Sequence, residues 1–197
     1  MNKILKFMLQ PDIFTIIVVV LLLVIGRYVF GMKYTSVKTI FSDYITCFQN
    51  KDGKLMMVPV FYYFGIPMMA SVFIAYKKEI DGNIVNIVTV IVSILTAMLF
   101  NTLTVVIEMK SKIRKDPLYY SMDAYLSKKA LIQTYYAVMF AILTSIVILI
   151  VCLFNVIVKE YSYIQSVILY YLVLLLLINL FMILKKIYKV IDTDMKK

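Results

Sequence analysis

The chain has 197 residues, a net charge of +10 and a composition that is 63% hydrophobic. Soluble domains are closer to half apolar, so this composition excludes an ordinary soluble domain and indicates a membrane protein. No polar block is long enough to fold separately, and we expect one membrane-embedded domain over residues 1–197. Histidine is absent and no phosphate-binding loop or hydrolase motif occurs, which argues against an enzyme.

The basic residues lie almost entirely in loops and tails, the distribution that the positive-inside bias produces. Direct binding of nucleic acid is therefore not expected, and contact with the anionic headgroups of the lipid bilayer is the better interpretation. Cys47 and Cys152 do not have the number or the spacing of a disulfide framework or a metal site. We expect no catalytic residue, no cofactor and no bound metal.

The first hydrophobic segment, residues 13–31, follows a short tail with two lysines. No small-residue cleavage site follows it, so we interpret it as a span and not as a removed signal peptide. Arg27, near its end, can snorkel to the interface or pair with Glu108 inside a bundle. Residues 34–48 carry apolar side chains at three- and four-residue steps, which predicts an amphipathic interfacial or re-entrant helix.

The second span, residues 59–76, opens with a proline and contains Gly65 and Pro67. Proline inside a helix removes one backbone hydrogen bond and kinks the helix, so Gly65 and Pro67 form a candidate hinge, with a simple packing kink as the alternative. Residues 77–83 are too short for anything but a turn, so we expect spans two and three to be antiparallel neighbours.

The third span, residues 84–109, carries the main functional prediction. Polar side chains interrupt it and fall within an arc of roughly 140° on the helix surface. They are Asn86, Thr89, Ser93, Thr96, Asn101, Thr104 and Glu108. Lipid offers these groups no hydrogen-bond partner, so the stripe should face protein or water, with this span at the centre of the bundle. It can line a pore or a seam between protomers, or pack by ordinary interhelical hydrogen bonds.

Residues 110–133 form the longest hydrophilic connection, which we predict to be a basic cytoplasmic loop. Pro117 breaks it in two, and Leu118–Leu131 after it has helix potential. The cations of this connection are Lys110, Lys112, Arg114, Lys115, Lys128 and Lys129. They form either a docking surface for a cytosolic protein or a solvated loop that only sets the topology. The fourth and fifth spans, residues 134–158 and 166–184, follow with a short turn between them.

The distribution of Lys and Arg predicts the orientation. If all five segments cross, one side carries five basic residues and the other fifteen. The richer side is then cytoplasmic, which places the C-terminus inside and the N-terminus outside. If residues 13–31 do not cross, four spans remain and the N-terminal tail is cytoplasmic. The predicted fold is thus an all-α polytopic membrane bundle of four spans, or five with the first segment, plus the interfacial helix.

The segment YYFGIPMMA, a short turn, the core SILTAMLFNTL, a basic loop and another helical hairpin follow one another over residues 59–185. In this order they resemble the small multi-span membrane proteins of bacterial phage-defence systems, such as the Kiwa membrane subunit. The resemblance is architectural and transfers no site residue. It implies a non-enzymatic, homo-oligomeric subunit of the bacterial inner membrane that senses infection or perturbs the membrane together with a cytosolic partner.

The alternative function is a permease or an accessory subunit of a membrane transporter. The two short-turn hairpins form a weak internal repeat, which transporters often contain. No charge lies near the middle of a span, which argues against an ion-coupled carrier. A membrane enzyme ranks last, because Glu108 is the only acidic residue inside a span.

Overall fold

The computed structural model describes residues 38–50, 53–115, 122–158 and 162–195. This part of the chain is helical apart from short connections and contains no β-strand, which confirms the all-α prediction. The predicted first span, residues 13–31, lies outside the described residues.

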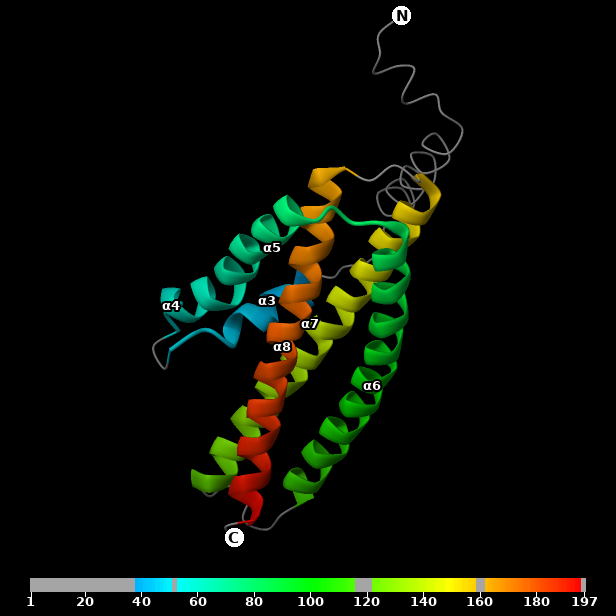
Figure 1. Cartoon of the computed structure of the whole chain (residues 1–197). Helices are drawn as coiled ribbons and strands as arrows, with labels where there is room; N and C mark the ends of the chain where they lie inside the picture. The colour runs from blue at the N-terminus through cyan, green and yellow to red at the C-terminus, as the bar shows by residue number, and fades with distance from the viewer. Residues whose placement is uncertain (1–37, 51–52, 116–121, 159–161, 196–197) are drawn as a thin grey trace, which may run out of the picture.

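The helices are of two kinds, short ones near the start of the described chain and three long ones after them (Figure 1). In chain order they are α3 (Lys38–Thr46), α4 (Met57–Val60), the π-helical turn η2 (Phe61–Gly65), α5 (Ile66–Lys77), α6 (Gly82–Lys115), α7 (Met122–Val158) and α8 (Tyr163–Met195). α4, η2 and α5 follow one another without a break.

Four of these helical segments are long and apolar enough to cross a membrane. They are Met57–Lys77, Gly82–Ser111, Lys128–Val156 and Tyr163–Asp192. Their length and composition indicate a membrane protein, and these four segments correspond to the second to fifth predicted spans.

The helices continue beyond the predicted spans. Residues 110–115 belong to α6 and residues 122–133 belong to α7. The prediction of a loop is therefore wrong for residues 110–115 and 132–133, whereas the helix potential of residues 118–131 is confirmed from Met122 onward. Hydropathy marks where a span leaves the apolar layer, whereas backbone hydrogen bonding ends only where the chain geometry or a helix breaker stops it. Pro117 lies within residues 116–121, the interval between the two helices.

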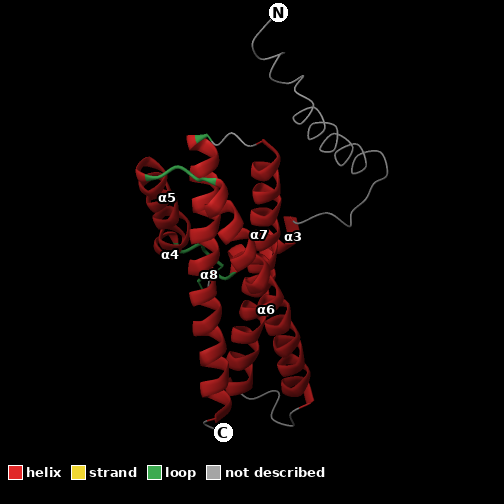
Figure 2. Ribbon diagram, turned by 45° about the vertical axis from the view of Figure 1, so that its right-hand side comes forward, coloured by secondary structure: helices red, strands yellow, loops and turns green. Residues whose placement is uncertain are grey.

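The four candidate spans pack as a row. α6 packs on α7, α7 on α8, and α8 on α5 (Figures 1 and 2). The inner position of α7 shows in its burial, since 50% of its apolar stretch is buried against 17% of that of α6. The expectation that the third span occupies the centre of the bundle is therefore wrong for the described part of the chain: α6 is an edge helix.

A seven-residue repeat explains how α6 attaches to α7. Val85, Val92, Leu99 and Val106 are each buried, and they recur at the spacing that keeps one seam of a helix against a single long neighbour. This seam buries α6 against a single helix, α7, so the rest of the α6 surface is available to lipid or to another chain.

The expected contact between spans two and three is also wrong, because α5 packs on α8 instead of on α6. The connection between α5 and α6 passes over the N-terminal end of α8 (Figure 1). There the Ser166 hydroxyl accepts a 3.0 Å hydrogen bond from the Ile80 N–H, and the Tyr170 hydroxyl donates to the Lys78 carbonyl over 3.2 Å. A short connection therefore brings α6 to the far side of α8.

The amphipathic helix predicted over residues 34–48 is confirmed over Lys38–Thr46, as α3, and residues 47–48 form the turn that follows. Tyr44 of α3 and Phe48, in the turn after it, are buried. The Tyr44 ring stacks on Phe140 of α7 with a centroid distance of 3.8 Å. After α3 the chain turns back to α4 through Gly53, whose φ of 74° lies in the left-handed region that glycine adopts without strain.

One amide joins three helices at this point. The Tyr44 hydroxyl of α3 donates to Asn179 Oδ1 of α8 over 3.2 Å, and Asn179 Nδ2 donates to the Ala137 carbonyl of α7 over 3.0 Å. Asn179 is 1% exposed, so both halves of its amide depend on these partners, because water does not reach it.

We predict that Asn179→Leu destabilises the protein by about 1–3 kcal/mol, because it leaves the buried Tyr44 hydroxyl without an acceptor. The free energy of unfolding in mixed micelles measures the effect. Tyr44→Phe is the matched control, since it keeps the stacked ring and removes only the hydroxyl. If the double variant loses the sum of the two single losses, the hydrogen bond between Tyr44 and Asn179 contributes nothing.

Candidate functional site

The polar stripe lies beside the buried apolar seam of α6, and most of it faces away from the other helices of the protomer. Thr89 and Thr96 are half-buried beside α7. The others are exposed, namely Asn86, Ser93, Asn101, Thr104 and Glu108. Within the described chain, therefore, the stripe does not enclose a channel, and its role as a pore or interprotomer lining stays a prediction.

The hydroxyl groups of the stripe bond to the backbone of their own helix. Thr89, Ser93 and Thr96 donate to the carbonyls of Val85, Thr89 and Val92, four residues earlier, over 2.8, 2.7 and 2.6 Å. Thr104 does the same to Phe100 over 3.3 Å. A hydroxyl satisfied in this way can face lipid tails, so these residues do not by themselves require a partner.

The amide groups of the stripe differ from the hydroxyls. Asn86 and Asn101 are exposed, and neither side chain forms a hydrogen bond with any residue that the structure describes. An Asn side chain has two donors and an acceptor, and it is too short to reach the interface from within a span. Asn101 is thus the stripe residue that most requires a partner outside the protomer.

The predicted basic surface lies at the ends of two adjacent helices. Lys110, Lys112, Arg114 and Lys115 are in the last two turns of α6, and Lys128 and Lys129 are in the second turn of α7. Both ends lie with the C-terminal end of α8 at the same end of the molecule (Figure 1). α8 adds Lys185, Lys186 and Lys189 there. Whether a cytosolic protein docks on this surface stays a prediction.

The candidate hinge coincides with η2. The Ile66 N–H bonds to the Phe61 carbonyl five residues back, which widens the turn just before Pro67. Since Pro67 cannot donate a hydrogen bond, the wider turn accommodates its ring within a continuous helix. A Cβ on Gly65 would lie 2.9 Å from the Phe61 ring. The structure thus places an irregular turn at Gly65 and Pro67, and motion about it stays a prediction.

Sequence reasoning missed a second polar pair beside Tyr44 and Asn179. The Lys186 ammonium of α8 donates to Gln133 Oε1 of α7 over 2.9 Å, and the Cys47 thiol contacts the Gln133 carbonyl over 3.7 Å. The sequence places Gln133 in the predicted loop and Lys186 in the C-terminal tail, so it does not predict that the two side chains pack together. The amphipathic pattern of residues 34–48 was the only available signal that something docks there.

The described residues contain no group of three or more His, Cys, Asp or Glu side chains that could hold a metal ion. The predictions that the protein is not an enzyme and needs no cofactor rest on the sequence alone and stay predictions. Comparison of the chain with protein-family models, curated proteins and solved structures gave no match. The resemblance to phage-defence membrane subunits stays a hypothesis.

Cys47 offers a chemical probe of the α3 docking. Burial is the main effect on its thiol and raises the pKa. The Lys186 ammonium lowers the pKa and the Asp43 carboxylate raises it, and the net shift is upward. Less of the reactive thiolate is then present at neutral pH than in an exposed cysteine.

We predict that Cys47 in a Cys152→Ser background reacts with iodoacetamide more slowly than an exposed thiol at pH 7.5, and that its rate keeps rising above pH 9. Tyr44→Ala should accelerate the reaction at every pH, because α3 loses its buried anchor. The alkylation rate by mass spectrometry is the measurement. Equal rates for Cys47 and a cysteine placed at exposed Lys54 would contradict the buried environment.

Proposed function

We propose that this chain is a non-enzymatic subunit of the bacterial inner membrane that assembles with copies of itself through the polar stripe of α6. Its work is antiviral defence, in which the assembly senses infection or perturbs the membrane together with a cytosolic protein bound at its basic end. The observation that carries the self-assembly is Asn101, an exposed amide within a span of an edge helix.

A second copy of this chain is the occupant that fits the stripe best. An amide is both donor and acceptor, so the same residue on two symmetry-related helices can pair with itself. Ser93 and Ala97 are small and four residues apart on this side of α6, a spacing that lets two membrane helices approach closely. A shallow hollow beside Ala97, lined also by Asn101 and Thr104, adds to this fit.

The defence role rests on the architectural resemblance, and the basic end supports it. Lysines cluster where α6 and α8 end and α7 begins, the arrangement that the positive-inside bias assigns to the cytoplasmic side. A cytosolic partner with an acidic surface would find complementary charge there.

We predict that Asn101→Leu weakens self-association about fivefold for each interhelical hydrogen bond lost, since such bonds are worth roughly 1 kcal/mol. The particle mass in lipid nanodiscs or by native mass spectrometry measures it across protein concentrations. Ile91→Leu is the matched control, because Ile91 is 52% exposed on the same helix but lies outside the stripe and does not line the hollow beside Ala97. A monomeric wild-type protein, or an unchanged Asn101→Leu assembly, would refute the α6 interface.

A functional prediction follows for cells. Expression of the chain with its neighbouring genes in a bacterial host should lower the plating efficiency of at least one phage, and Asn101→Leu should abolish that protection while Ile91→Leu keeps it. Conductance of the purified assembly in planar bilayers distinguishes a pore from a packing seam. Unaltered plating efficiency across a broad phage panel would contradict the defence role. It would not affect the proposed self-association, which the particle mass tests separately.

A further inference from the structure

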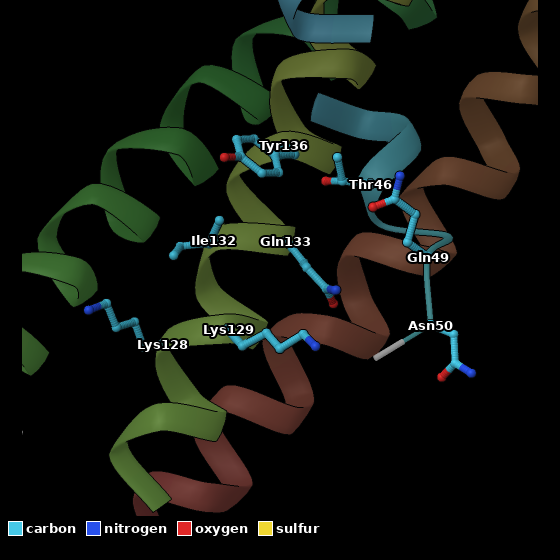
Figure 3. Close-up of a pocket in the computed structure, with 8 residues that line it drawn as sticks. All are labelled: Thr46, Gln49, Asn50, Lys128, Lys129, Ile132, Gln133 and Tyr136. Carbon is cyan, nitrogen blue, oxygen red and sulfur yellow. The ribbon is translucent and has the colours of Figure 1, made fainter. Parts of the chain in front are cut away.

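A second surface of the protein is suited to bind a ligand. Where α3 ends beside the start of the apolar stretch of α7, a pocket of about 350 Å³ opens, at the lower end of the roughly 300–1,000 Å³ of small-molecule sites. Gln49 and Asn50 line it from the α3 side, and Lys129 and Gln133 line it from α7. Figure 3 shows Lys129 and Gln133 extending toward Gln49 and Asn50, whereas Lys128 extends to the other side of α7.

The chemistry of this pocket selects an anion. Among the residues that line it in the described chain, Lys128 and Lys129 are cationic and none is acidic. Gln133 Oε1 already accepts the hydrogen bond from Lys186, which leaves the NH₂ group of the same amide as a donor toward the pocket. Lysine ammonium and amide N–H groups are donors that bind a phosphate.

An apolar hollow adjoins the polar pocket. It measures about 340 Å³ and lies between α6 and α7, where Val106, Ile107, Leu131 and Tyr135 line it. Ile132 and Tyr136 line both spaces, so the two meet along one face of α7, and Lys110 stands at the hollow as well. A free phosphate would use only the polar part, whereas an amphiphile would fill both.

The position of the two spaces along the helices suits an amphiphile. The apolar stretch of α6 ends at Ser111 and that of α7 begins at Lys128, so the pocket lies where the helices leave the hydrocarbon layer. Basic pockets between membrane helices on the cytoplasmic side are a known way to bind anionic lipid headgroups.

We propose that this end of the protein binds an anionic phospholipid, with the phosphate held by Lys129 and Gln133 beside the end of α3, and with one acyl chain in the hollow between α6 and α7. The headgroup part of the site lies beside α3, and the hollow contacts α6 only near its C-terminal end, at Val106, Ile107 and Lys110. The site is formed within one protomer and is independent of the self-association proposed above.

The test uses the full chain, purified in detergent and titrated with phosphatidylglycerol or phosphatidylcholine, with bound lipid counted by native mass spectrometry. We expect selective retention of phosphatidylglycerol, and about fivefold weaker retention by Lys129→Gln, the loss expected for one basic residue. Lys129→Arg should bind as the wild type does. Lys77→Gln removes the same charge at the opposite end of the molecule and should leave retention unchanged.

A second variant tests the acyl-chain part. Ile107 is 51% exposed, so Ile107→Trp fills the hollow without disturbing a buried contact, and it should lower phosphatidylglycerol retention. Equal retention of both lipids, or wild-type retention by Lys129→Gln, would overturn the proposal. Complete displacement of the lipid by a millimolar excess of inorganic phosphate would overturn it in favour of a soluble-anion site. Bound lipid is counted separately on monomers and on larger particles, so that a failure of lipid binding can be told apart from a failure of self-association.

Discussion

The hydrocarbon layer offers no hydrogen bond to a polar side chain, and this constraint decides how the helices of this protein pair. Inside the protomer it is met at Asn179, whose amide joins α3, α7 and α8 through the Tyr44 hydroxyl and the Ala137 carbonyl. The Tyr44–Phe140 stack holds α3 against the same junction. Because α3 is fixed there, the turn after it reaches the start of α7, where the polar pocket forms.

The same constraint separates two kinds of polar residue on α6. Serine and threonine reach the carbonyl four residues earlier and are satisfied within the helix. Asparagine cannot do this as readily, because its amide presents two donors as well as an acceptor. The stripe thus contains two kinds of residue. Asn86 and Asn101 require a hydrogen-bond partner outside their own helix, whereas the serine and threonines do not.

The two proposed surfaces lie on different parts of the molecule and use different chemistry. The α6 stripe is neutral over most of its length and is largely exposed on the surface of the protomer, where another helix can pair with it. The pocket between α3 and α7 is basic and lies at the edge of the apolar layer, where a headgroup can reach it. A bound lipid at this edge would contact the C-terminal end of α6 through the adjoining hollow.

The sequence by itself determined the membrane class, the four spans and the helical character of residues 38–46, because hydropathy and periodicity depend on local composition. It did not determine where α6 and α7 end, since helical hydrogen bonding continues past the last apolar residue. Only the tertiary structure decided the order of the row, in which α5 packs on α8 and α6 becomes an edge helix. Contacts such as Tyr44 with Asn179, 135 positions apart, depend on how whole helices face one another, and no local pattern in the chain encodes that.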